Sequence, residues 1–140
     1  MRISVEPSTD PADYPFHHRI RARFAETDAM GIVHHGRYFP YLEEARVAYL
    51  RHISHPYTEW RQHGTDSAVL EVYVRYVRPL RFDDEFDVHT SLADVTRTTF
   101  QMSYLLTRGD DSCAMAVTAH GLLNAAGRPI RLPAWLKELR

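Results

Sequence analysis

The stretch AETDAMGIVHHGRYFPYLEEAR, residues 25–46, places an aspartate in unusually apolar surroundings. Asp28 is followed by Ala29, Met30 and Gly31, whereas a surface loop is normally more polar. Glycine permits turns closed to other residues, so Gly31 and Gly36 favour a loop that delivers unpaired backbone amides to one small pocket. A carboxylate facing such N–H donors suits acyl transfer, in which one group attacks or activates water and the amides hold the oxyanion. The alternative is that Asp28 only caps a turn.

The elements that would position this loop follow from the hydrophobic periodicity. Residues 17–26 alternate as a half-buried strand does, and residues 38–53 follow a helical period. Pro40 is acceptable only in the first turn, so the helix should begin near residues 37–39. A short helical segment at 57–64 and a helical tail at 132–139 are also expected. Four further strands are predicted at 67–80, 85–95, 98–108 and 112–125, with turn signals between them.

The alternation within the predicted strands also names the side chains that should face the core. We expect these to be Ile20, Ala22 and Phe24 in the first strand, then Leu70, Val72, Val74 and Tyr76, then Phe86, Val88, Thr90 and Leu92, then Phe100, Met102, Tyr104 and Leu106.

One long helix across a curved antiparallel sheet is an α+β arrangement. Residues 1–15 carry three prolines and are predicted to form an extended arm, with residues 16–140 forming a single domain. Such a sheet leaves edges and a second face uncovered, so we expect a second copy to pair with the chain.

The composition narrows the class of protein. Hydrophobic residues make up 44% of the 140 residues, charged residues 25%, and the net charge is −1. These values indicate an ordinary globular chain without a general attraction for nucleic acid. No apolar run approaches the length of a membrane span, and residues 1–16 lack the apolar region of a secretory signal. The single cysteine, Cys113, excludes an internal disulfide and fits a cytoplasmic location.

Two charged residues interrupt the apolar side of the long helix. Glu43 and Arg46 stand three positions apart, so an ion pair between them is one expectation. The other is that Glu43 helps to shape an acyl pocket. His34 and His35 belong to no recognisable metal-binding pattern, so we predict no metal site and no cofactor.

The motif resembles the signature of the 4-hydroxybenzoyl-CoA thioesterase family of hotdog-fold proteins, and within it the short acyl-CoA thioesterases of the YbgC type. The pattern D-x-x-G-h-V-x-x-x-x-Y, followed five residues later by an acid, is met by Asp28, Gly31, Val33, Tyr38 and Glu43. The similarity continues through residues 74–104 and 127–136, so it covers nearly everything after the arm.

The resemblance implies a hotdog fold, in which a five-stranded antiparallel sheet wraps a long central helix. It implies acyl-CoA hydrolysis by a homodimer or a tetramer built of two dimers, with active sites between subunits. Asp28 would be the nucleophile or general base, the backbone amide of His35 the oxyanion donor, and Arg97 a contact for the CoA phosphates. The basic cluster around Arg97 is fuller in some members of the family.

Two other functions remain open from the sequence. A hotdog dehydratase would also hold a thioester with helix-end amides, but it needs a histidine as proton shuttle, for which His34 or His35 is available. A non-catalytic acyl-CoA-binding module would keep the CoA site without needing Asp28.

Overall fold

The computed structural model describes residues 1–139 and contains one antiparallel sheet with a long helix across it. The strands lie in the order β1-β3-β4-β5-β2, and the short β6 pairs with the end of β5. Their bounds are β1 (Phe16–Arg21), β2 (Asp66–Tyr76), β3 (Glu85–Val95), β4 (Thr99–Arg108), β5 (Asp111–Leu123) and β6 (Pro129–Ile130). The helices are α1 (Tyr38–His52), α2 (Tyr57–Gln62) and α3 (Ala134–Glu138). The predicted α+β arrangement is confirmed, with β6 added to the five expected strands.

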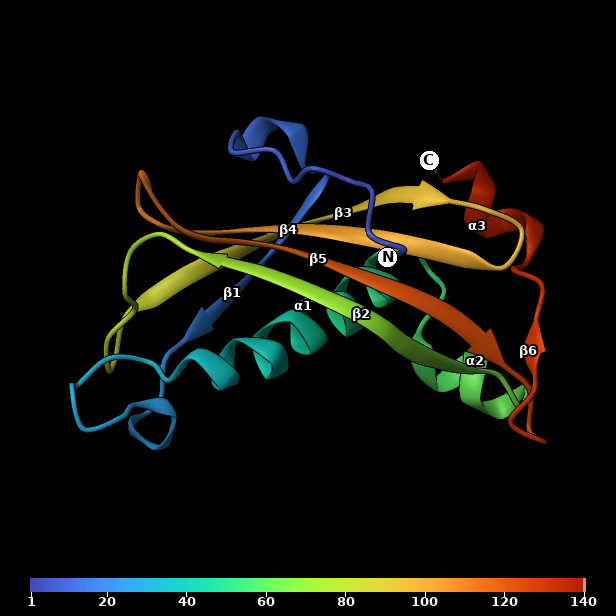
Figure 1. The fold of residues 1–140 in the computed structure, drawn as a ribbon, viewed down its shortest axis with the longest axis horizontal. Coiled ribbons are helices and arrows are strands. Elements are labelled where there is room, and N and C mark those ends of the chain that lie inside the picture. Colours follow the sequence, from blue (N-terminus) through green and yellow to red (C-terminus); the bar gives the residue numbers. More distant parts are fainter. Residues whose placement is uncertain (140) are drawn as a thin grey trace.

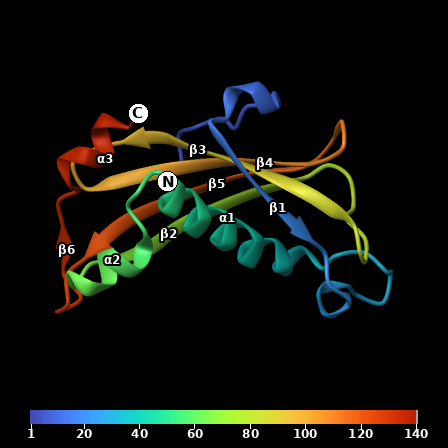
Figure 2. The ribbon, with the colours of Figure 1, turned by 180° about the vertical axis from the view of Figure 1, so that it is seen from behind.

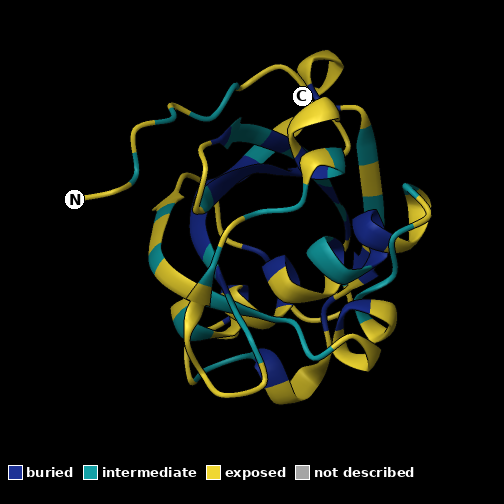
Figure 3. Cartoon of the chain, turned by 90° about the vertical axis from the view of Figure 1, so that its right-hand side faces the viewer, coloured by how far each residue is buried: buried dark blue, intermediate teal, exposed yellow. Residues whose placement is uncertain are grey.

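Helix α1 lies against the concave face of the sheet (Figures 1 and 2). Its fully buried Leu42 and Ala45 belong to one core with Phe86, Val88 and Leu106 of the central strands. Figure 3 shows buried residues on the inner strands, and exposed residues in the turns, the terminal segments and parts of the helices and outer strands. Because one stripe of α1 fills the concave face, the amino end of the helix is held at one end of the sheet.

The edge strand β2 differs from its predicted pattern. Leu70, Val72 and Tyr76 are 41%, 39% and 47% exposed, so the prediction that they are buried is wrong. The register against β5 shifts between Val69 and Glu71, and this bulge leaves Leu70 without a partner on β5. Val72 and Tyr76 stay exposed because β2 is the last strand of the sheet and no strand within residues 1–139 pairs with its outer edge.

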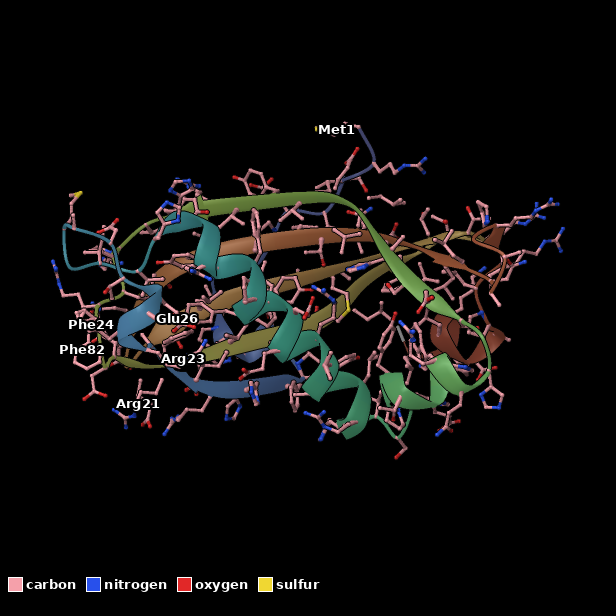
Figure 4. The ribbon with its side chains drawn as sticks, turned by 90° about the horizontal axis from the view of Figure 1, so that it is seen from below. Met1, Arg21, Arg23, Phe24, Glu26 and Phe82 are labelled. Atoms are coloured by element: carbon pink, nitrogen blue, oxygen red, sulfur yellow. The ribbon has the colours of Figure 1, made fainter. Side chains whose placement is uncertain are left out.

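Phe24 is a second exception, with an exposed fraction of 69%. Strand β1 ends at Arg21, and Phe24 begins a short 3₁₀ turn that carries its ring outward. There the ring packs on the exposed Phe82, with a distance of 5.6 Å between the ring centroids. Both phenylalanines lie at the outer margin of the molecule in Figure 4.

The N-terminal arm lies on the face of the sheet opposite to α1. One carboxylate oxygen of Glu71 accepts hydrogen bonds from the backbone N–H groups of Arg2 and Ile3, at 2.7 and 2.9 Å. The side-chain oxygen of Gln101 likewise accepts from the next two residues of the arm. Farther along, Tyr14 is buried in a cluster with Leu105 and Met115. The arm therefore covers part of the outer face that the sheet alone would expose.

Candidate active site

Asp28 lies in a tight loop that follows β1 and leads to α1. The loop is closed by two backbone hydrogen bonds, from the Asp28 N–H to the carbonyl of Ile32 and from the Gly31 N–H to the carbonyl of Asp28, each 2.9 Å long. Gly31 has a φ of +77°, a backbone conformation that other residues rarely adopt. One carboxylate oxygen of Asp28, Oδ1, accepts from the Met30 N–H at 2.8 Å. Among the described residues the other oxygen has no hydrogen-bond donor, so it is available for chemistry.

Glu26, two residues earlier, holds this loop in place. Its carboxylate accepts from the backbone N–H of Arg23 at 2.7 Å and from the Tyr41 hydroxyl on α1 at 2.8 Å. Its carbonyl accepts from the His34 N–H at the far end of the loop. Burial tends to raise the pKa of the Glu26 carboxyl, but the Arg23 N–H, the Tyr41 hydroxyl and the Arg23 guanidinium together hold it below its usual value. Figure 4 shows Glu26 and Arg23 together beside the start of α1.

The sequence analysis missed Glu26 because the residue falls at the end of a predicted strand. The available signal was its spacing from Arg23, since an acid three positions after the residue that precedes a helical turn can bond back to that residue's N–H.

The backbone amides before α1 are not equivalent. The Gly36 N–H already donates to the Nδ1 atom of His34 at 3.1 Å. The His35 N–H, by contrast, has no acceptor within residues 1–139, and it lies in the 3₁₀ turn His35–Arg37 that leads into α1. The Tyr76 hydroxyl donates to the His35 carbonyl at 2.9 Å and so ties this turn to β2. His35 therefore offers one free N–H at the positive end of the helix dipole.

Asp28 and His35 line the same cavity, which has a volume of about 460 Å³, in keeping with a small-molecule site. Val33, Tyr38 and Tyr76 line it as well. Val33 is buried, and its N–H donates to the Leu80 carbonyl at 2.7 Å. Burial raises the pKa of Tyr38 to about 12, which keeps its phenol neutral. Four of the residues predicted from the sequence motif thus meet here, with Gly31 shaping the turn.

Although the sequence around Asp28 is apolar, the loop residues do not keep water from the Asp28 carboxylate in a single copy of the chain. Asp28 is only half-buried, Ala29 is exposed, and Met30 is 77% exposed. The loop projects from the end of the sheet, so nothing within residues 1–139 covers it. Val77, which lines the same cavity, also remains exposed, at 44%. An apolar rim thus surrounds the carboxylate without closing over it.

Two predicted site residues lie elsewhere. Glu43 lines two other hollows, farther along α1. The expected Glu43–Arg46 ion pair is absent from the described residues, because Arg46 turns inward to the Tyr104 hydroxyl while Glu43 stays exposed. Arg97 occupies the turn between β3 and β4, at the opposite end of the sheet from Asp28 (Figure 1). The 11 residues of β3 separate the two ends by roughly 35 Å.

Within residues 1–139 no three histidine, cysteine, aspartate or glutamate side chains gather in a way that could hold a metal ion. None of the helices in that range has the length and apolar character needed to cross a membrane.

Comparison with known proteins places residues 22–139 within the family described as the thioesterase-like superfamily. A putative esterase of Aquifex aeolicus is 41% identical over 89% of this chain and 97% of its own length. The 1,4-dihydroxy-2-naphthoyl-CoA hydrolase of Thermosynechococcus vestitus is 31% identical over 82% of this chain and 84% of its own. Among solved structures, a DHNA-CoA thioesterase from Staphylococcus aureus matches with a TM-score of 0.82 and 25% identity, over 87% of this chain and 83% of that one.

Proposed function

Because the chain belongs to the thioesterase-like superfamily, we propose that it hydrolyses the thioester of an acyl-CoA to the free acid and CoA. The observation that carries this proposal is the meeting of two unsatisfied groups in one cavity. Asp28 keeps a carboxylate oxygen without a donor, and His35 keeps an N–H without an acceptor, among the described residues. These are the base or nucleophile and the oxyanion donor that acyl transfer requires.

In the general-base route, Asp28 takes a proton from water while the water oxygen attacks the thioester carbonyl carbon. The carbonyl oxygen then carries the negative charge and accepts a hydrogen bond from the His35 N–H. Collapse of this intermediate breaks the carbon–sulfur bond, and the thiolate of CoA leaves with the proton that Asp28 received. In the nucleophilic route, Asp28 itself attacks, the thiolate leaves first, and water then cleaves the resulting anhydride.

The proposed enzyme is a homodimer joined through the β2 edges. Strand β2 has hydrogen bonds to β5 on one side only, and its exposed apolar side chains continue the rim around Asp28. A second copy on this edge would cover that rim and exclude water from the Asp28 carboxylate. It would also give Arg97 of the second copy a route to the same substrate, since Arg97 and Asp28 occupy opposite ends of one chain.

The test is turnover on a panel of acyl-CoAs, with release of the free thiol as the measurement. Asp28→Asn keeps the size of the side chain, and we expect it to lower kcat at least about a hundredfold, the effect of losing a catalytic base. Asp110→Asn, at an exposed turn between β4 and β5, is the matched control.

Hydrolysis by Asp28→Asn at the wild-type rate would refute the role of Asp28. If neither protein hydrolyses any thioester but both bind CoA, the chain is an acyl-CoA-binding module and not an enzyme. Hydration or dehydration of an enoyl thioester without thiol release would identify a dehydratase.

A further inference from the structure

Farther along α1 lies a second hollow, enclosed by α1, α2, β2 and β4. Its volume is about 250 Å³, and it is lined largely by apolar and aromatic groups, among them Tyr57, Trp60 and Phe100. An adjoining hollow shares Arg46 and Val69 with it and reaches Phe39 and Val72. The three hollows are lined in order along both elements: the Asp28 cavity by Tyr38 and Tyr76, the adjoining hollow by Phe39 and Val72, and the second hollow by Leu50 and Ser67. We call this series the α1–β2 groove.

The polar group of the second hollow is Arg46. It projects from the middle of α1, and its guanidinium donates to the hydroxyl of the fully buried Tyr104 at 3.3 Å. Within residues 1–139 no carboxylate forms an ion pair with it. Glu43, on the rim, is exposed, so water screens its charge. Arg46 therefore brings a positive charge and unused N–H donors to a mostly apolar hollow.

Behind Arg46 a chain of buried hydrogen bonds crosses the sheet. The Tyr104 hydroxyl lies 2.7 Å from the hydroxyl of Thr118, which lies 2.7 Å from Nε2 of His120. The Nδ1 atom of His120 lies 3.2 Å from the hydroxyl of Ser67, back at the lining of the hollow. Burial, with a smaller contribution from Arg46, lowers the pKa of His120 to about 3, so its ring is neutral and carries one N–H.

Arg46 fixes the direction of this chain because a guanidinium can only donate. Tyr104 accepts from Arg46 and so donates to Thr118. Thr118 in turn donates to Nε2 of His120, which leaves the ring proton on Nδ1 for the Ser67 oxygen. The reverse direction would leave the Tyr104 proton without an acceptor in a fully buried site. The proton of the Ser67 hydroxyl is then free, so the hollow presents hydrogen-bond donors at both ends, Arg46 and Ser67.

We propose that this hollow holds the far end of the acyl group and selects acyl-CoAs whose acyl chain ends in a carboxylate, that is, monothioesters of dicarboxylic acids. A carboxylate supplies the acceptors and the negative charge that Arg46 and Ser67 lack, while the methylene chain lies against apolar side chains. From Tyr38 to Arg46 the helix rises about 12 Å, which a medium-length chain crosses. This proposal rests on the proposed hydrolysis at Asp28, which it deepens by naming the substrate class.

The test compares octanedioyl-CoA with octanoyl-CoA, which differ only at the end of the chain. We expect wild-type kcat/KM to favour the octanedioyl substrate at least about tenfold, the scale of a charge-assisted hydrogen bond. Arg46→Met should bring the ratio of the two kcat/KM values close to one, and Arg46→Lys should restore part of it. Ser67→Ala should lower the ratio by about fivefold, the scale of a neutral hydrogen bond.

Arg51→Met is the matched control, since Arg51 lies on α1 but is exposed. It should leave the ratio unchanged. A ratio near one in the wild type, or a wild-type ratio that persists in Arg46→Met, would overturn the proposal while hydrolysis itself stood.

Calorimetric titration of the Asp28→Asn protein with octanedioate and with octanoate separates the two proposals, because binding needs no turnover. Preferential binding of octanedioate that Arg46→Met abolishes would support the site even if no thioester were hydrolysed. Equal binding of the two acids would refute it.

Discussion

The two ends of the α1–β2 groove leave polar groups unpaired in different surroundings. At the amino end of α1, Asp28 and His35 line a cavity whose rim is exposed, and the loop and turn that carry them lie at the end of the sheet. In the middle of α1, Arg46 faces a hollow between packed elements, and a buried chain of hydrogen bonds orients its neighbours. The exposed cavity at Asp28 suits catalysis once a second copy covers it. The enclosed hollow at Arg46 suits ligand recognition, because rigid surroundings discriminate between ligands.

The largest effect is expected from a variant that cannot pair with a second copy through β2. Leu70→Glu with Tyr73→Glu places charges on the exposed β2 edge, where a carboxylate facing its symmetry mate disfavours pairing. We expect a particle of 16.3 kDa by light scattering and a fall in kcat of at least about a hundredfold, comparable to the loss of Asp28.

The affinity of the hollow at Arg46 for octanedioate should change far less than kcat in this variant, because the lining of that hollow comes from one chain. A wild-type protein that is monomeric at micromolar concentration and fully active would rule out a shared active site.

A smaller effect is expected from loosening the loop that carries Asp28. Glu26→Gln removes the charge that accepts from Arg23 and Tyr41, and this should cost about 1–3 kcal/mol in the free energy of unfolding. We expect kcat to fall more than KM changes, since a displaced Asp28 affects the reaction more than CoA binding.

Chemical denaturation and steady-state kinetics measure the two quantities for Glu26→Gln. Glu44→Gln, at an exposed carboxylate that bonds to His18, is the control and should alter neither. An unchanged kcat in a destabilised Glu26→Gln protein would show that Glu26 supports the fold but does not position Asp28.

The buried chain of hydrogen bonds behind Arg46 can be tested through the protonation of His120. Its pKa is about 3 in the folded chain and near 6.5 in an unfolded one, so the unfolded state binds more protons between these values. Stability should therefore decrease as the pH falls through this window, by up to about 1.4 kcal/mol per pH unit. Denaturation at a series of pH values measures the slope.

His120→Gln should reduce that slope, whatever its effect on stability at neutral pH. His89, whose pKa burial also lowers, contributes a smaller slope, and His89→Gln serves as the comparison. A slope unchanged in His120→Gln would mean that His120 is not held neutral by burial.

The sequence predicts the parts of this structure that depend on local pattern. Pro40 and the helical period place α1 within one residue of its observed limits, Tyr38–His52, and all the side chains predicted to face the core from β3 and β4 are buried, although in β4 the alternate side chains are buried as well. The motif around Asp28 also gives four of the residues that line the cavity.

The features that the sequence could not give depend on contacts between distant residues. The bulge at Leu70 arises from the register of β2 on β5, and the alternation of β2 contains no sign of it. Ser67 and His120 are 53 positions apart, so their contact exists only once the sheet has formed. Arg46 turns away from Glu43 because the buried Tyr104 hydroxyl offers it an acceptor, which a helical wheel does not show.

The Arg97→Ala variant tests whether a second copy completes the active site around Asp28. Its side chain is exposed in the turn between β3 and β4, while its carbonyl accepts from the Leu132 N–H, so removal of the side chain should leave the turn intact. If Arg97 of a second copy binds the phosphates of CoA, Arg97→Ala should raise KM about fivefold with little change in kcat, and the effect should shrink as salt is added.

A pantetheine thioester lacks the nucleotide and should not respond to Arg97→Ala. Arg128→Ala, another exposed arginine in a turn, is the control for a general loss of positive charge. Equal losses on the CoA and pantetheine substrates would mean that Arg97 acts on folding or assembly. A selective loss on the CoA substrate would instead require two chains in each site, because the length of β3, about 35 Å, separates the turn that carries Arg97 from the end of the sheet where Asp28 lies.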